Sequence, residues 1–176
     1  LVDDVSEDID TNLLWEAWMT LRSRNVYLYL AESNLQDDEN LSIGAQYELS
    51  NGKNISNDDL NRSMIMRSEL TKKIDYLFGE YDFLAMPSAQ VFPFDKNIDY
   101  PNKISGQDMQ TYHKWMEVTV LSSLLGLPTI SIPVGFNENN LPMGMQIIGR
   151  KKEDLRVISF AKKYEQIFGY SNVTPT

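Results

Sequence analysis

The chain has 176 residues, of which 42% are hydrophobic and 11% aromatic, so it can bury one globular core but is too short for two comfortable domains. Its net charge of −9 excludes the concentrated basic face that nucleic-acid binding requires, and the lack of cysteine excludes disulfides, thiolate catalysis and cysteine-ligated metals. Because no apolar run reaches the length of a membrane span, we expect a cytoplasmic protein that binds neither nucleic acid nor membrane.

The first third of the chain predicts one helix between two irregular stretches. Residues 1–11 are acidic and predict poor order, and because the chain begins with Leu1 rather than Met, we also expect a fragment or a processed chain. Between residues 12 and 32, apolar side chains recur at mostly helical spacing and predict a long helix with a broad buried face. Residues 33–55 are rich in Asn, Asp, Gly and Ser, a composition typical of a loop.

A second helix and a short strand are predicted next. Ser56 followed by Asp59 resembles a capping box, and acidic side chains suit the positive end of a helix. This helix is expected to run to about Phe78 and to end at Gly79. Residues 82–87 then predict a short buried strand.

The stretch that follows predicts a long connection and another helix. Residues 89–105 contain proline and several Asn and Asp, which is typical of a connection that shapes a pocket rather than a core. Ser105 with Asp108 is expected to begin a helix whose apolar stripe includes Met116 and Leu124.

Two strands and a helix complete the predicted elements. Residues 126–135 form a β-branched segment bracketed by Gly and Pro, and residues 141–150 form a second apolar segment. The turn at residues 137–140 is short enough for the two strands to be antiparallel neighbours. A last helix is expected from Asp154, and residues 171–176 are expected to fray.

These elements indicate an α/β fold in which helices cover an apolar sheet. Only three strands are predicted for four helices, and a three-stranded sheet is a thin core for that many helices. The strand set therefore favours a larger sheet whose other strands come from sequence outside this chain.

Four segments resemble the C-terminal part of the amidase-signature family. They are residues 52–60 (GKNISNDDL), 81–88 (YDFLAMPS), 126–136 (GLPTISIPVGF) and 141–150 (LPMGMQIIGR) with the Glu-Asp-Leu that follows at 153–155. The last two in tandem are specific, because the residue types and the intervening turn both match. The resemblance covers roughly residues 40–168.

The resemblance implies an α/β/α domain around a mixed sheet, of which residues 1–176 would be the C-terminal portion. Enzymes of this family hydrolyse carboxamides and some esters through a Ser–Ser–Lys arrangement with a Gly-rich oxyanion loop, and need no cofactor. That machinery belongs to the N-terminal side of the family fold. The resemblance therefore implies a parent hydrolase of carbon–nitrogen bonds, with this chain inactive alone.

No residue of this chain has the sequence setting that the chemistry requires. Ser122 and Ser123 are flanked by leucines and predict helix packing rather than an oxyanion loop. The lysines lie in charged runs that predict a solvated surface, whereas a catalytic lysine must be buried enough for its pKa to fall. His113, the only histidine, is predicted on the surface beside Lys114. We assign no catalytic residue and no metal ligand.

The resemblance instead places pocket-lining residues here. By position in the family, the helix before the Gly-Leu-Pro turn and the connection after the first strand line the acyl side of the substrate pocket. The candidate substrate-binding residues are therefore Trp115, Met116, Thr119, Pro87 and Ser88. For Trp115, core packing is the alternative. An apolar wall of Trp and Met favours a neutral, hydrophobic acyl group.

Three functions are left open by the sequence. The first is the C-terminal portion of an amidase that acts on a small-molecule amide. The second is a non-catalytic interaction module with the same half-fold. The third is an A-type component of a glutamyl-tRNA amidotransferase, although a charged amino-acid substrate fits an apolar wall poorly. Uncovered sheet edges also predict a homodimer.

Overall fold

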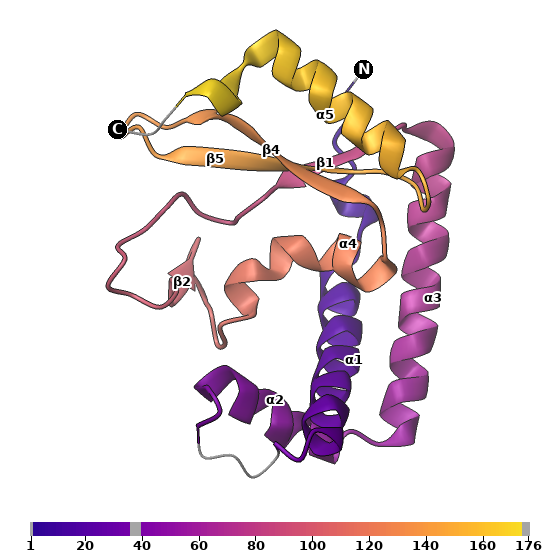
Figure 1. Cartoon of the computed structure of the whole chain (residues 1–176). Helices are drawn as coiled ribbons and strands as arrows, with labels where there is room; N and C mark the ends of the chain where they lie inside the picture. Colours follow the sequence, from indigo (N-terminus) through magenta and orange to yellow (C-terminus); the bar gives the residue numbers. More distant parts are fainter. Residues whose placement is uncertain (1, 36–39, 174–176) are drawn as a thin grey trace. The chain divides into compact units, whose positions relative to one another are not determined.

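A computed structural model describes residues 2–35 and 40–173, which divide into a first unit, Leu1–Ile74, and a second unit, Asp75–Thr176. Figure 1 shows the elements in chain order. The helical elements are η1 (Ser6–Asp8), α1 (Thr11–Glu32), α2 (Ile43–Asn54), α3 (Asn57–Glu80), η2 (Lys114–Thr119), α4 (Val120–Leu125), α5 (Asp154–Phe168) and η3 (Tyr170–Asn172). The strands are β1 (Leu84–Pro87), β2 (Lys103–Ile104), β3 (Gln107–Asp108), β4 (Thr129–Phe136) and β5 (Pro142–Ile148).

Helix α1 confirms the long helix predicted for residues 12–32. Asp10 caps its N-terminus, because the Asp10 carboxylate accepts a hydrogen bond from the backbone N–H of Leu13 at 2.9 Å. Leu14, Ala17 and Leu30 are buried, but Leu14 and Leu30 lie on nearly opposite sides of the helix, so the burial is not confined to a single face.

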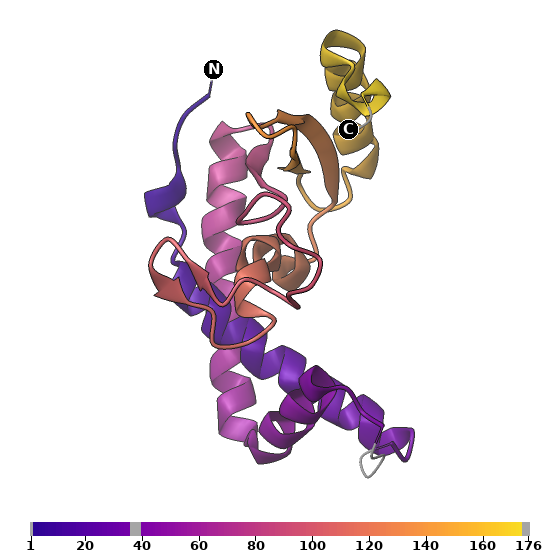
Figure 2. The same ribbon diagram turned by 90° about the vertical axis from the view of Figure 1, so that its left-hand side faces the viewer.

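Helix α2 was missed, since residues 33–55 were predicted as a loop. Gly52, one of the residue types that suggested a loop, is buried in this helix, as is Glu48. A Cβ at Gly52 would lie 2.1 Å from the backbone oxygen of Ser23 in α1, so only glycine allows the two helices to approach this closely. Tertiary contact with α1 therefore forms a helix that local propensity does not predict. Figure 2 shows α1 and α2 side by side.

Helix α3 begins with the predicted capping box. The backbone N–H of Ser56 donates to the Asp59 carboxylate at 2.9 Å, and the backbone N–H of Asp59 donates to the Ser56 hydroxyl at 3.1 Å. The predicted end at Gly79 is wrong, because the helix continues to Glu80.

The three predicted long strands form one sheet in the order β1-β5-β4. The predicted antiparallel pairing of the last two strands is confirmed, with Thr129 opposite Ile148 and Ile132 opposite Met145. β1 also runs antiparallel to β5, with Leu84 opposite Ile148. The central strand of the described sheet is therefore the one that comes last in the chain.

One face of this sheet is covered by α5, the helix predicted from Asp154 (Figure 1). Ile132 and Ile147 from the sheet pack with Ala161 of α5, and half-buried apolar side chains surround them. Burial of this face contributes apolar stabilisation to the second unit.

The helix predicted to begin at Ser105 is wrong. Ser105 and Gly106 both have positive φ (48° and 83°) and form a tight turn between β2 and β3, as in the two-residue turns of hairpins. Helical structure begins at Lys114 instead, first as the 3-10 helix η2 and then as α4.

An α/β fold is confirmed, with helices on both sides of the sheet in the second unit. The poor order predicted for residues 1–11 and 171–176 stays a prediction: Leu1 and residues 174–176 lie outside the described residues, and η1 and η3 occupy part of the rest. Among the residues that the structure describes, no helix is both long and apolar enough to cross a membrane.

Candidate functional site

The side-chain amide of Gln146, in β5, brings two of the predicted pocket segments together. Its Nε2 donates to the backbone oxygen of Pro87 at 2.8 Å and to the backbone oxygen of Val118 at 3.1 Å. Pro87 ends β1, and Val118 lies in η2 beside Thr119. The structure therefore places Pro87 and Ser88 next to the segment that holds Trp115, Met116 and Thr119.

Ser88 continues the line of β1 beyond its last residue. Its backbone N–H donates to the oxygen of Gly144 at 2.9 Å, and its hydroxyl lies 2.6 Å from the hydroxyl of Ser131 in β4. A Cβ at Gly144 would lie 2.8 Å from the Ser88 hydroxyl and 3.0 Å from that of Ser131. The glycine therefore leaves room for a pair of hydroxyls across the central strand.

The 3-10 helix η2 holds the other three predicted residues. Trp115 and Met116 are half-buried, whereas Thr119 is exposed. The Thr119 hydroxyl donates to the backbone oxygen of Met116 at 2.9 Å, which holds that side chain against its own helix.

Trp115 is the centre of an aromatic cluster. Its ring makes edge-to-face contacts with Phe94, at 5.6 Å between centroids, and with Tyr112, at 6.2 Å. Its indole N–H is buried and has no hydrogen-bond partner among the residues that the structure describes. The connection predicted to shape a pocket thus supplies Phe94 to this aromatic cluster.

The lysines, Ser122, Ser123 and His113 were all rejected as catalytic residues from the sequence, and the structure gives the position of each. Every lysine described by the structure is exposed or half-buried, and Lys73 pairs with Asp8 at 2.7 Å. Ser122 and Ser123 lie in the short helix α4, as predicted, with Ser123 exposed. The prediction of a surface histidine is wrong, because His113 is only 6% exposed and its ring contacts Tyr112.

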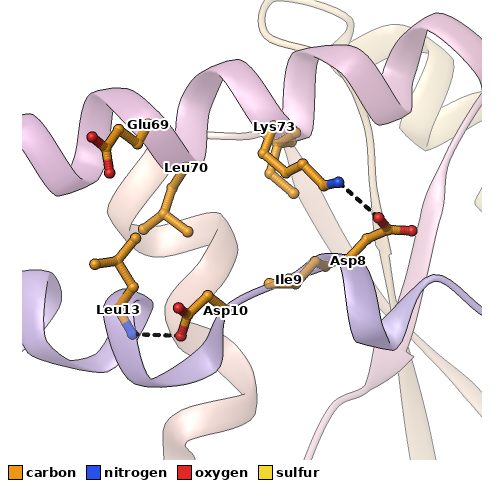
Figure 3. A pocket seen from close by; sticks show the side chains of 8 residues that line it. Asp8, Ile9, Asp10, Leu13, Glu69, Leu70 and Lys73 are labelled. Atoms are coloured by element: carbon orange, nitrogen blue, oxygen red, sulfur yellow. Dashed lines mark hydrogen bonds and ion pairs between the residues drawn. The ribbon is translucent and has the colours of Figure 1, made fainter.

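A hollow of about 160 Å³ lies elsewhere, in the first unit (Figure 3). Leu13 and Leu70 point toward one another across it, and the Lys73–Asp8 ion pair closes one end. None of the predicted pocket residues lines it. Across residues 2–35 and 40–173, no three His, Asp or Glu side chains gather as metal ligands would.

Sequence reasoning missed Ser131, Gly144 and Gln146, although all three lie in the two segments that carry the family resemblance. The available signal was period-two alternation: Gln146 interrupts an otherwise apolar strand, and Ser131 stands between two isoleucines. Register across β4, β5 and β1 was needed to show that these side chains share one face.

In the second unit of this α/β protein, α5 covers one face of the sheet, and the other face carries the buried Gln146 beside the exposed Ser131. The family model described as Amidase matches residues 18–158. The chain belongs to the amidase family.

Curated relatives are similar over more than half of the chain. The A subunit of the glutamyl-tRNA(Gln) amidotransferase of Brevibacillus brevis (strain 47 / JCM 6285 / NBRC 100599) is 33% identical over 112 residues, 62% of this chain and 21% of that protein. The corresponding protein of Orientia tsutsugamushi (strain Boryong) is 36% identical over 91 residues, 51% of this chain and 17% of that protein. The chain spans about a fifth of the length of these relatives.

Among solved structures, a bacterial aryl acylamidase of the amidase-signature family matches 97% of this chain and 36% of its own, with a TM-score of 0.78 and 21% identity. Another amidase structure matches 87% of this chain and 35% of its own, with a TM-score of 0.76 and 19% identity. Both likenesses show the fold alone.

Proposed function

We propose that this chain forms one wall of the substrate pocket in an amidase that hydrolyses small carboxamides. The observation that carries the proposal is the junction at Gln146, which joins the Pro87–Ser88 segment to η2. Sequence resemblance alone assigned both segments to the acyl side of a pocket. Their proximity in the fold supports that assignment, because two separate segments of one pocket must meet.

The chemistry of this wall favours a neutral, apolar acyl group. Trp115 and its aromatic neighbour Phe94 offer a large apolar surface with defined ring geometry. Met116 adds a flexible apolar side chain that adapts to irregular shapes. The only cationic side chain of η2, Lys114, already pairs with Glu117 at 2.6 Å, so a substrate carboxylate gains little there.

Both units are proposed to belong to the C-terminal portion of one amidase domain, since the family match covers parts of each. We further propose that nucleophile, base and oxyanion loop lie outside these 176 residues. No described lysine is buried, and desolvation is what lowers the pKa of a catalytic lysine. Purified chain incubated with acetamide, hexanamide and benzamide is expected to release no ammonia; release that co-purifies with the chain would contradict this.

Selectivity for the acyl chain tests the pocket wall. In an active amidase that contains this chain, Trp115→Ala is expected to lower the ratio of kcat/KM for hexanamide to that for acetamide about tenfold, because the longer chain loses its apolar contact. Trp18→Ala, in α1 of the first unit, is the matched control and should leave the ratio unchanged. If the hexanamide-to-acetamide ratio of Trp115→Ala equalled that of the control, the proposal that Trp115 lines the substrate pocket would be refuted.

A second candidate function is that of an A-type component of a glutamyl-tRNA(Gln) amidotransferase, which the curated relatives favour. This function would require glutamine as the ammonia donor and a protein partner. Ammonia release from glutamine and from hexanamide distinguishes the two candidate functions. A pocket lined by Trp and Met should favour hexanamide, whereas an amidotransferase component should favour glutamine.

A homodimer is proposed on separate grounds. In the described sheet, β1 and β4 pair only with β5, so each presents one strand edge that lacks a strand neighbour there. A second copy could pair with such an edge. Light scattering on the purified chain is expected to give twice the 20.3 kDa mass of one chain. A monomer at all accessible concentrations would contradict the dimer.

A further inference from the structure

Gln146 is a polar side chain buried on the face of the sheet that α5 does not cover. It is 5% exposed. Its strand neighbours Met145 and Ile147 pack in the cluster that includes Ala161 of α5. Because successive strand residues point to opposite faces, Gln146 points away from α5, and its bond to Val118 of η2 agrees with that direction.

The amide group is well suited to this position. Its –NH2 carries two donors in a fixed plane, whereas a carboxylate only accepts and a thioether donates nothing. Both donors are used, on Pro87 and on Val118, which are 31 residues apart along the chain and belong to different elements. If either segment moved away, a buried donor would lose its partner, which is unfavourable.

Gly144 and the two hydroxyls define the face beside this junction. Ser131 lies directly opposite Gln146 in the sheet register, and Gly144 precedes Gln146 by two residues on the same face. Since Gly144 has no side chain, the Ser88–Ser131 hydroxyl pair meets no obstruction there, and Ser131 is exposed. The buried Gln146 side chain therefore lies next to the exposed part of this sheet face, where Ser131 is located.

We propose that Gln146 is a positioning residue that fixes the distance between the two segments of the proposed pocket wall, the Pro87–Ser88 segment and η2. The inference rests on the proposed function and adds a cause of selectivity. Two hydrogen bonds from one rigid group set the width of the pocket at this point, and pocket width decides which acyl chain fits. Loss of the bonds should therefore change acyl selectivity through KM, whereas kcat for a small amide should change little.

The first test measures the junction directly in the purified chain by amide hydrogen exchange. Gln146→Met removes both donors with little change in volume, and Gln146→Glu keeps the shape while replacing the amide. Gln166→Glu, exposed on α5, is the matched control for the second variant. In both Gln146 variants, amides of η2 and of Ser88 are expected to exchange at least fivefold faster, whereas the α5 amides keep the control rate.

If the η2 amides of the Gln146 variants exchanged at the rate seen in Gln166→Glu, the proposal would be overturned. The hydrogen bonds of Gln146 would then not hold η2 against the Pro87–Ser88 segment. Faster exchange throughout the second unit would also overturn it, since Gln146 would then act only on overall stability. Thermal unfolding followed by circular dichroism verifies that at least one of the two variants folds before the exchange is compared.

The second test measures selectivity in the active amidase that contains this chain. Gln146→Met is expected to change the hexanamide-to-acetamide ratio of kcat/KM at least fivefold, mostly through KM. An equal loss for both amides would contradict positioning while leaving the proposed function intact. A wild-type enzyme without amidase activity would instead refute the proposed function, and with it the pocket role of Gln146, even if the exchange test shows the junction.

Discussion

Each unit of this protein contains a buried polar side chain that joins two segments, but the two units use different chemistry. In the first unit, the carboxylate of Glu48 in α2 is 1% exposed; it accepts from the Arg22 guanidinium at 2.7 Å and from the Ser23 hydroxyl. In the second unit, the neutral amide of Gln146 donates to two backbone carbonyls.

The difference shows what each junction can do. Glu48 joins consecutive helices through a partly solvated charge pair, because Arg22 keeps 40% of its side chain exposed. Gln146 joins segments that are distant in sequence and leaves the neighbouring sheet face open beside Ser131. The first arrangement joins the two helices of a hairpin, whereas the second is proposed to hold the Pro87–Ser88 segment and η2 at a fixed separation. We therefore expect substitutions in the first unit to affect stability and those near Gln146 to affect selectivity.

The largest effect is expected from Gly52→Ala, which attacks the helix contact of the first unit. The added Cβ would lie 2.1 Å from the Ser23 oxygen and 2.5 Å from the Tyr27 Cβ, so α1 and α2 must separate. Overpacking of this kind costs about 3 kcal/mol of unfolding free energy. Chemical denaturation of the chain measures it.

Gly44→Ala in the same helix is the matched control for this prediction. A Cβ at Gly44 would meet nothing closer than the Ser42 hydroxyl at 4.0 Å, and alanine is the better helix former. Equal stability of the two variants would show that the close approach of α1 and α2 is not what holds the hairpin.

A smaller effect is expected from Glu48→Ala. The substitution leaves the buried Ser23 hydroxyl without its acceptor and the Arg22 guanidinium without its counter-ion, at a cost of about 2 kcal/mol. The control is Glu69→Ala, exposed on α3, which should cost well under about 1 kcal/mol. If Glu48→Ala were as stable as the control, the buried carboxylate would have no structural role and the comparison between the two junctions would fail.

The smallest effect is a pH dependence at the capping box of α3. Hydrogen bonds from the Ser56 side chain and backbone lower the pKa of Asp59 below its ordinary value. A lowered carboxyl pKa adds stability that is present above the unfolded pKa and is lost as the pH falls through the folded pKa. The melting temperature should therefore fall below about pH 4, and less so in Asp59→Asn.

Asp58→Asn, one residue earlier in the same turn, is the control for the charge itself. It keeps the bonds between Ser56 and Asp59 and should retain the wild-type acid transition. An identical acid transition in all three proteins would exclude the capping box as its source.

The sequence predicted the elements that depend on local signals. The capping box at Ser56 and the two strands with their turn were identified, because side-chain caps and β-branched runs act over a few residues. Helix α2 was not, because its formation depends on the contact of Gly52 with α1 and on the partners of Glu48. These contacts lie more than 20 residues away along the chain.

The candidate site was predicted in part for the same reason. Trp115 and Pro87 were named from segment resemblance, but nothing local indicated that one amide from β5 would bond both to Pro87 and to Val118 in the helix of Trp115. The buried position of His113 was also missed, since its neighbours on the chain are polar or exposed and its burial depends on tertiary packing. The role of a side chain cannot be predicted from the sequence alone when it depends on strand register or on long-range contacts.

Photo-crosslinking tests the central claim most directly, because it locates the substrate without assuming a mechanism. A photoreactive carboxamide, 4-benzoylbenzamide, would be irradiated with the proposed amidase that contains this chain, and the adducts mapped by peptide mass spectrometry. We predict adducts in residues 87–88 and 115–119, reduced by excess hexanamide. Adducts confined to the hollow of the first unit, at residues 8–13 and 69–74, would contradict the assignment of the pocket to the second unit.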